Sequence, residues 1–216
     1  MPIAQRLFRR RALARLATLA ATLAAPGAVG LAGAQSRPAL EPTPRDAEGP
    51  FYPTRLPADA DFDLTRVAGR NKPAQGTPLV IAGRVLAVNG NPLAGARVEL
   101  WQCDATGTYH HVGGSVGDED FQGYGAVTSD GEGRYAFRTI RPVAYGGRPP
   151  HLHFRITHAR AQSLTTQLYP RGESAERMSG FGLSSREARS RLEFAMVPAA
   201  EAGALAASYD FVLRAA

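Results

Sequence analysis

Short stretches in which apolar and polar residues alternate follow one another from about residue 79 onward, separated by turns rich in Gly, Pro and Asn. A period of two residues predicts strands with one buried face, and Asn89-Gly90 and residues 129–133 are typical of the turns between strands. We expect strands at residues 79–81, 85–88, 96–101, 134–140, 151–157 and 209–213, and one short helix at 184–194. This pattern predicts an all-β fold, a single antiparallel β-sandwich with long loops.

The segment that precedes the first strand has a different character. Residues 35–78 hold eight of the sixteen prolines and show little periodicity. Such a composition predicts an extended arm that runs over the surface and forms no domain of its own. The β-sandwich domain is therefore expected to span residues 79–216.

Residues 1–34 have the composition of an export signal. Arginines without any acidic residue precede an Ala- and Leu-rich run at 16–25, and the small residues at 32–34 match a cleavage site. The pair Arg10-Arg11 favours twin-arginine export. A membrane anchor helix is the alternative, but a proline and two glycines interrupt a span already short of the roughly 20 apolar residues that a bilayer requires. We expect a periplasmic or secreted protein, cleaved near Ala34-Gln35, with no stable membrane anchor.

Charge and cysteine content exclude two classes of function. The chain has 25 basic and 19 acidic residues, and removal of residues 1–34 leaves 20 basic against 19 acidic. A nearly neutral domain lacks the basic surface that nucleic-acid binding requires, so we expect no nucleic-acid partner. The single cysteine, Cys103, excludes an intramolecular disulfide and any metal site built from a cysteine cluster.

The expected strand at 151–157 carries two histidines on one face. His151 and His153 are two residues apart, so their side chains point the same way while Leu152 and Phe154 point the other way. Their Cα atoms would lie about 6.6 Å apart, from a rise of about 3.3 Å per residue. This spacing lets both imidazoles bind one metal ion. Purely structural histidines are the alternative, and the residues alone favour neither.

Other ligand patterns narrow the choice of metal site. A cupin would place Glu three or four residues beyond the H-x-H pair, where Ile156 and Thr157 stand, and no histidine has the His-x-Asp/Glu spacing of a 2-His-1-carboxylate iron site. The H-E-x-x-H zinc motif is absent as well. Tyr109 and Tyr145 are the nearby polar candidates, because a phenolate is a hard, anionic donor that suits ferric iron. Each tyrosine taken alone is explained more simply as an amphipathic residue at the rim of the core.

Several segments together resemble one enzyme family. Residues 93–104 (LAGARVELWQCD), 133–142 (GRYAFRTIRP) and 145–154 (YGGRPPHLHF) resemble the intradiol ring-cleavage dioxygenases, the non-haem ferric enzymes typified by protocatechuate 3,4-dioxygenase. Residues 48–52 (EGPFY) are similar to the N-terminal arm of that family. The Tyr-x-x-Arg-x-x-His spacing at 145–151 resembles the small, single-chain, exported members.

The resemblance implies which residues form the site. The four iron ligands of the family correspond to Tyr109, Tyr145, His151 and His153. Tyr145 and His151 would be axial, and a hydroxide would be the fifth ligand. Arg148 corresponds to an arginine that stabilises charge on the substrate, and Gln167 to a glutamine behind the ligands.

The resemblance also implies an activity for the domain at 79–216. With Fe(3+) as cofactor, both atoms of O₂ would be inserted into a catechol-type diol, and the ring would be cleaved between its hydroxyl-bearing carbons to a muconate-type diacid. The partners would be a small aromatic diol and O₂, and a homo-oligomer is compatible with the family. A non-catalytic, transthyretin-like binding module is the alternative, because strand pairs similar to residues 83–96 occur there too. Such a module needs no tyrosine and histidine ligands and would be colourless.

Overall fold

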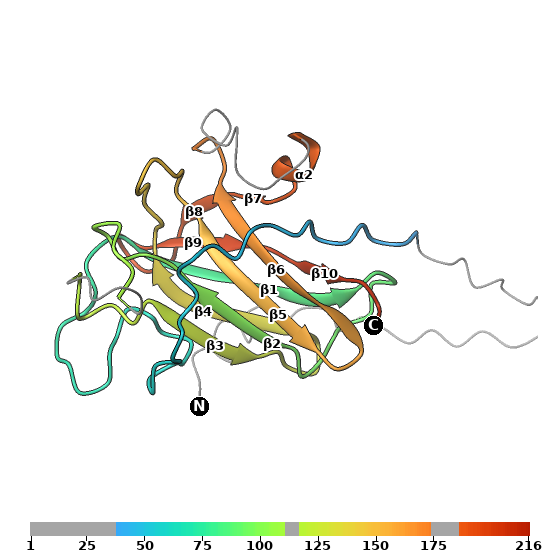
Figure 1. Cartoon of the computed structure of the whole chain (residues 1–216), viewed down its shortest axis with the longest axis horizontal. Helices are drawn as coiled ribbons and strands as arrows, with labels where there is room; N and C mark the ends of the chain where they lie inside the picture. The colour runs from blue at the N-terminus through green and yellow to red at the C-terminus, as the bar shows by residue number, and fades with distance from the viewer. Residues whose placement is uncertain (1–37, 111–116, 174–185) are drawn as a thin grey trace, which may run out of the picture. The chain divides into compact units, whose positions relative to one another are not determined.

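The computed structural model describes residues 38–110, 117–173 and 186–216, and its strands form two β-sheets (Figure 1). The first sheet contains β1 (Pro78–Ala87), β4 (Arg134–Ile140), β8 (Met196–Pro198), β9 (Leu205–Ser208) and β10 (Phe211–Leu213). The second has the order β3 (Tyr124–Thr128), β2 (Arg97–Trp101), β5 (Leu152–His158), β6 (Ala161–Pro170) and β7 (Glu193–Phe194). The described helix α2 covers only Arg186–Ser190.

The apolar faces of the two sheets form one buried core. Core side chains of the first sheet are Leu79, Ile81, Val85, Phe137 and Phe211, and those of the second are Val98, Leu100, Phe154, Ile156 and Leu168. The Phe154 ring joins the layers, because its centroid lies 6.3 Å from that of Phe137 and 5.0 Å from that of Phe211. The predicted β-sandwich is thus confirmed. Among the described strands, five pairings are antiparallel, and β1–β9, β1–β10 and β6–β7 are parallel.

The observed elements differ locally from the expected ones. The expected strands at 79–81 and 85–88 are one continuous strand, β1. After the turn at Asn89-Gly90, the chain pairs with β1 only through an isolated antiparallel bridge between Leu86 and Pro92. The chain then crosses to the second sheet, where β2 pairs with β3 and β5. The helix expected at 184–194 is shorter, since α2 ends at Ser190 and β7 follows; residues 184–185 lie outside the described residues. Periodicity did not predict β3, β6, β8 or β9.

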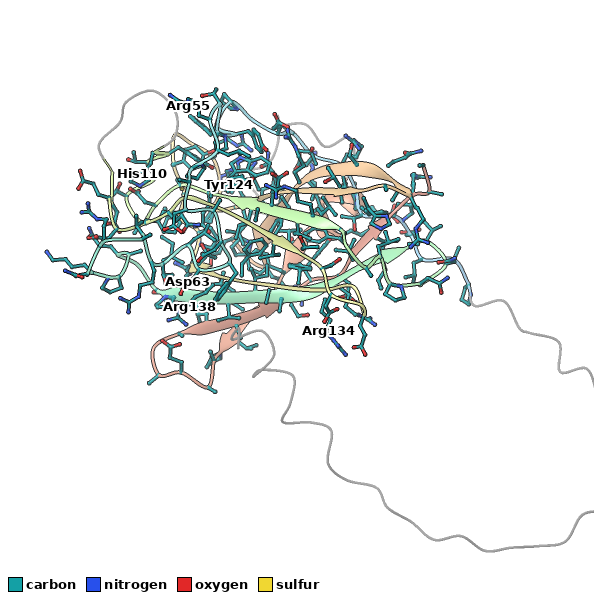
Figure 2. The ribbon with its side chains drawn as sticks, turned by 90° about the horizontal axis from the view of Figure 1, so that it is seen from below. Arg55, Asp63, His110, Tyr124, Arg134 and Arg138 are labelled. Carbon is teal, nitrogen blue, oxygen red and sulfur yellow. The ribbon has the colours of Figure 1, made fainter. Side chains whose placement is uncertain are left out.

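The described part of the arm, residues 38–77, contains no helix or strand, and its residues 44–47 lie beside β6 (Figure 1). Asp46 N donates to Thr165 O (3.1 Å), and Thr166 Oγ1 donates to Pro44 O (2.8 Å). Further along, Asp63 lies beside Arg138 of β4, as Figure 2 shows, and forms an isolated bridge with it. These hydrogen bonds and the bridge at Asp63 therefore connect the arm to both sheets.

The export signal expected at residues 1–34 lies outside the described residues. Within the described ranges, no helix has the length and apolar character needed to cross a bilayer.

Candidate metal centre

Strand β5 and the residue before it bring two imidazoles together. His151 and His153 are 1% and 0% exposed, while the alternate residues Leu152 and Phe154 point into the core. His151 Nδ1 donates to Pro149 O (2.7 Å), which leaves Nε2 as the unprotonated nitrogen. The two Nε2 atoms lie 3.1 Å apart.

Both imidazoles are held in the neutral form that binds metals. The pKa of His151 is lowered to about 4, chiefly by burial; the hydrogen bond to the Pro149 carbonyl opposes this shift, and the Arg148 guanidinium adds to it. Burial lowers the pKa of His153 still more strongly, together with the neighbouring His151 and Arg148. Neither group needs to lose a proton at neutral pH before it can coordinate an ion.

Tyr145 and Arg148 flank a two-residue turn. Gly146 and Gly147 have φ angles of +51° and +76°, and Arg148 N donates to Tyr145 O (2.7 Å). Two consecutive positive φ angles define a tight turn that glycine adopts at little cost. The turn aims both side chains toward the histidines, and Tyr145 Oη lies 3.3 Å from His151 Nε2.

Tyr109 comes from the loop that follows β2. The Asp104 carboxylate shapes this loop, because it accepts hydrogen bonds from Thr106 N (2.8 Å), Thr108 N (3.0 Å) and Asp118 N (2.7 Å). Tyr109 is 7% exposed, and its Oη lies 3.3 Å from Tyr145 Oη. The fourth candidate ligand thus reaches the other three through a loop held by one buried carboxylate.

The two phenols need a cation in order to ionise. Burial raises the pKa of Tyr109 far above its ordinary value, and the adjacent Tyr145 raises it further. Burial also raises the pKa of Tyr145, although Tyr109 and Arg148 oppose that shift. Both side chains are therefore neutral phenols without a bound cation, and a metal ion that binds them must displace their protons.

The spacing of the four donor atoms fits a single metal ion. Successive donors lie 3.3, 3.3 and 3.1 Å apart along the series Tyr109, Tyr145, His151, His153. Metal–nitrogen and metal–oxygen bonds of about 2.0–2.2 Å give neighbouring ligands separations of roughly 2.9–3.5 Å. Across the described residues, no group of three or more His, Cys, Asp or Glu is placed to hold a metal, so the tyrosines are essential to this set.

The other two predicted site residues contact each other beside this cluster. Arg148 Nη2 donates to Gln167 Oε1 (2.9 Å). Gln167 is fully buried on β6, directly opposite His153 on β5. The structure thus brings together all six residues named from the sequence.

The arm adds contacts that periodicity gave no reason to expect. Phe51 of the arm stacks on Tyr109 with ring centroids 4.3 Å apart, whereas Trp101, which stacks on His153 with centroids 4.9 Å apart, belongs to β2. Gly49 has a φ of +72°, and a Cβ at that position would lie 3.3 Å from His153 Cε1. The EGPFY motif at 48–52 was the sequence signal for this part of the site.

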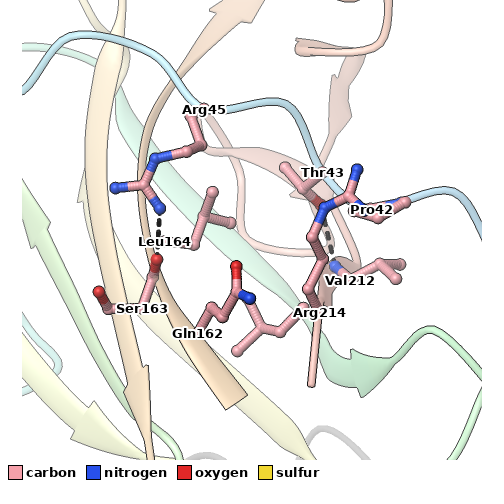
Figure 3. Close-up of a pocket in the computed structure, with 9 residues that line it drawn as sticks. Pro42, Thr43, Arg45, Gln162, Ser163, Leu164, Val212 and Arg214 are labelled. Carbon is pink, nitrogen blue, oxygen red and sulfur yellow. Dashed lines mark hydrogen bonds between the residues drawn. The ribbon is translucent and has the colours of Figure 1, made fainter. Parts of the chain in front are cut away.

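A separate pocket lies between the arm, β6 and β10, as Figure 3 shows, and none of the six site residues lines it. Its volume is about 80 Å³, with Arg45 and Arg214 among the lining residues. Pockets for small organic ligands measure about 300–1,000 Å³. This pocket is too small to be the binding site for an aromatic substrate.

Comparisons with known proteins agree with this geometry. Residues 47–215 match a family model described as Dioxygenase. The protocatechuate 3,4-dioxygenase beta chain of Burkholderia cepacia is 35% identical over 184 residues, which cover 79% of this chain and 78% of that protein. Catechol 1,2-dioxygenase 1 of Acinetobacter lwoffii is 34% identical over 149 residues, which cover 61% of this chain and 47% of that protein. The chain thus spans about half the length of this second relative.

A solved structure shows the same fold. The dioxygenase domain of a dioxygenase and carbohydrate-binding protein fusion from Streptomyces sp. SirexAA-E superposes with a TM-score of 0.61 and 27% identity, covering 82% of this chain and all of that domain. The family match covers more than half of the chain and includes every residue of the tyrosine and histidine cluster. The chain belongs to the intradiol ring-cleavage dioxygenase family.

Proposed function

We propose that this chain is a non-haem iron(III) dioxygenase that inserts both atoms of O₂ into a catechol-type diol and opens the ring between the two hydroxyl-bearing carbons. The observation that carries the proposal is the cluster of two tyrosine Oη and two histidine Nε2 atoms, with successive atoms 3.1–3.3 Å apart, in a chain of this family. Family membership also disfavours a non-catalytic, transthyretin-like module. The products balance, because a benzenediol plus O₂ has the composition of a muconate-type diacid.

Tyr109, Tyr145, His151 and His153 would hold the iron. When bound, ferric iron supplies a Lewis acid that draws electron density from the diol and prepares its ring for reaction with O₂. Two neutral imidazoles and two phenolates provide a hard donor set with two negative charges, which favours the ferric state.

Tyr145 is the tyrosine better placed to take a substrate proton. Its side chain is half-buried on the Gly146-Gly147 turn, whereas Tyr109 is buried beneath the Phe51 ring. Burial raises the pKa of Tyr145, so its phenolate, once released from a cation, is a strong base at neutral pH. The phenolate oxygen would accept a hydroxyl proton from the diol as the diol binds.

Arg148 supplies the positive charge beside the cluster. A guanidinium is protonated throughout the physiological range and directs several N–H donors at one region. Its electrostatic effect reaches His151, His153, Tyr109 and Tyr145. Negative charge that develops on the substrate ring would be stabilised there, while Gln167 holds the guanidinium in place.

Iron analysis, a visible spectrum and product identification test the proposal on the purified chain. We expect about one iron per chain and a visible phenolate-to-iron band, consistent with two tyrosine ligands. A diol panel of catechol, protocatechuate and 6-chlorohydroxyquinol, taken from the names of relatives, should include a substrate that yields a diacid. With ¹⁸O₂, both labelled atoms should appear in that product. A colourless protein that binds zinc and cleaves none of the diols would refute the proposal.

We also propose that residues 1–34 direct twin-arginine export to the periplasm or the exterior. Support comes from the basic, apolar and small-residue order of that segment and from the single cysteine, since a domain without disulfides can fold and bind its metal before export.

A further inference from the structure

Asp46, a carboxylate of the arm, lies at the far end of a hydrogen-bond network that begins at Arg148. Arg148 Nη2 donates to Gln167 Oε1 (2.9 Å), and Tyr169 Oη lies 2.9 Å from that same oxygen. Tyr169 Oη also lies 2.8 Å from Asp46 Oδ2. Gln167 and Tyr169 are 0% and 2% exposed, so water competes little for these contacts.

The number of protons in this network assigns a direction to each hydrogen bond. The Tyr169 hydroxyl has one proton and two acceptor oxygens in reach, and a carboxylate accepts more strongly than an amide oxygen. The proton therefore points to Asp46, and the lone pairs of Tyr169 Oη remain for the Arg148 guanidinium, which also hydrogen-bonds this hydroxyl. Gln167 Nε2 donates to Ala47 O (2.6 Å), which fixes Oε1 toward Arg148.

Asp46 is itself held firmly. Its backbone N donates to Thr165 O (3.1 Å), and its Oδ1 accepts from Ala47 N (2.7 Å). Only Oδ2 is directed at Tyr169. The carboxylate is close enough to Arg148 for a direct electrostatic attraction as well.

We propose that Asp46 is a positioning residue of the active site, which holds the Arg148 guanidinium in place by orienting the Tyr169 hydroxyl. The inference rests on the proposed function, in which Arg148 stabilises charge on the substrate. It assigns the arm a part in turnover through a residue that touches neither metal nor substrate. The network spans 123 residues of sequence between Asp46 and Tyr169.

Asp46→Ala and Tyr169→Phe test the proposal on the full chain. Both variants should keep the iron content and visible band of the parent, because the four donor residues are unchanged. Loss of one charge-assisted hydrogen bond should lower kcat about tenfold and change KM by less than about threefold. Glu41→Gln is the matched control, since it removes an exposed ion pair between the arm and Arg191 but leaves the network and residues 46–52 unchanged. Its kcat should stay within about twofold of the parent.

A double-mutant cycle separates positioning from a general loss of stability. If Asp46 acts through Arg148, Asp46→Ala should cause less than about a twofold further loss of kcat in an Arg148→Ala background. Multiplicative losses in the double variant would overturn the proposal. Should Asp46→Ala fail to fold, Asp46→Asn removes the charge at almost the same volume and should show a smaller loss with the same non-additivity.

A measurement that needs no activity distinguishes this proposal from the proposed function. In ¹⁵N-labelled, iron-free full chain, the Arg148 Nε–H resonance is assigned by its absence in Arg148→Lys. This resonance should shift and exchange faster with water in Asp46→Ala, and stay unchanged in Glu41→Gln. An unchanged resonance in Asp46→Ala would overturn the positioning role. A parent chain without iron or ring cleavage would overturn only the proposed function.

Discussion

Replacement of Gly49 by alanine should weaken metal binding through a single methyl group. Gly49 has a φ of +72°, and the added Cβ would lie 3.3 Å from Cε1 of His153. This separation is shorter than an ordinary carbon–carbon contact of about 3.5–4.0 Å. The imidazole would have to move by a few tenths of an ångström, and Trp101, stacked on it with centroids 4.9 Å apart, restricts that movement.

Backbone strain also contributes to the effect of Gly49→Ala on stability, and it must be measured separately from the contact with His153. A left-handed φ costs an alanine about 1–2 kcal/mol relative to glycine. Gly69 offers the control, because its φ is +80° and no atom lies within 4 Å of the Cβ that alanine would add. Gly69→Ala should therefore lower Tm by about 2–8 °C, at about 2–4 °C per kcal/mol for a domain of this size, and leave metal binding unchanged.

The comparison of the two variants isolates the contact with His153. Gly49→Ala should lower Tm by an amount similar to Gly69→Ala. In addition, it should lower iron affinity about tenfold or more, which is typical when a contact that orients a metal ligand is disturbed. Iron affinity would be measured by competition with a chelator, and strain by thermal unfolding of both variants. Equal iron affinity in Gly49→Ala and Gly69→Ala would show that the arm does not set the position of His153.

Three further predictions concern ligands, stability and export. Tyr145→Phe should keep a sizeable fraction of the iron but lower turnover, whereas Tyr109→Phe should lose most of the visible band; equal bleaching would contradict their separate roles. Burial opposes ionisation of Asp104, but hydrogen bonds to the Asp118 amide and to nearby threonines lower the net pKa. The stabilisation by these hydrogen bonds is present above the ordinary pKa of 3.8 and is lost as the pH falls through the lower folded-state pKa. Asp104→Asn should therefore lower the free energy of unfolding in urea by about 1–3 kcal/mol at pH 7, and by progressively less as the pH falls below 3.8. Replacement of Arg10-Arg11 by Lys-Lys should block export, and full-length chain integral to the membrane would instead indicate an anchor.

The strands that could be predicted are those with one apolar face and one polar face. β2, β4 and β5 alternate clearly, and each begins and ends within one residue of its expected bounds. β6 could not be recognised, because its buried positions include Thr166 and Gln167. Their polar groups are satisfied by carbonyl oxygens of Pro44 and Ala47 about 120 residues away, and no local pattern reports such a partner.

The histidine pair could be inferred from strand geometry alone, since a period of two places His151 and His153 on one face. The tyrosines could be named only as nearby polar candidates, because Tyr109 and Tyr145 lie in loops without periodicity. The resemblance to a family was needed to favour them over ordinary rim residues. Neither strand periodicity nor the resemblance to a family indicated a role for Asp46 or Tyr169. A carboxylate in a proline-rich segment is ordinarily a solvated charge, and its role depends on where the arm meets β6.

The position of the arm has a consequence for how the site is built. The four candidate metal ligands come from the β-sandwich and its loops. Three residues of the arm nevertheless contact the site: Phe51 packs on Tyr109, Gly49 lies close to His153, and Ala47 O accepts a hydrogen bond from Gln167 Nε2. A segment without secondary structure is ordinarily the least stable part of a domain. Because these contacts reach both the ligands and the residue that holds Arg148, loosening of the arm should impair metal geometry and charge stabilisation together. Stability of the arm is thus a requirement of the site as much as of the fold.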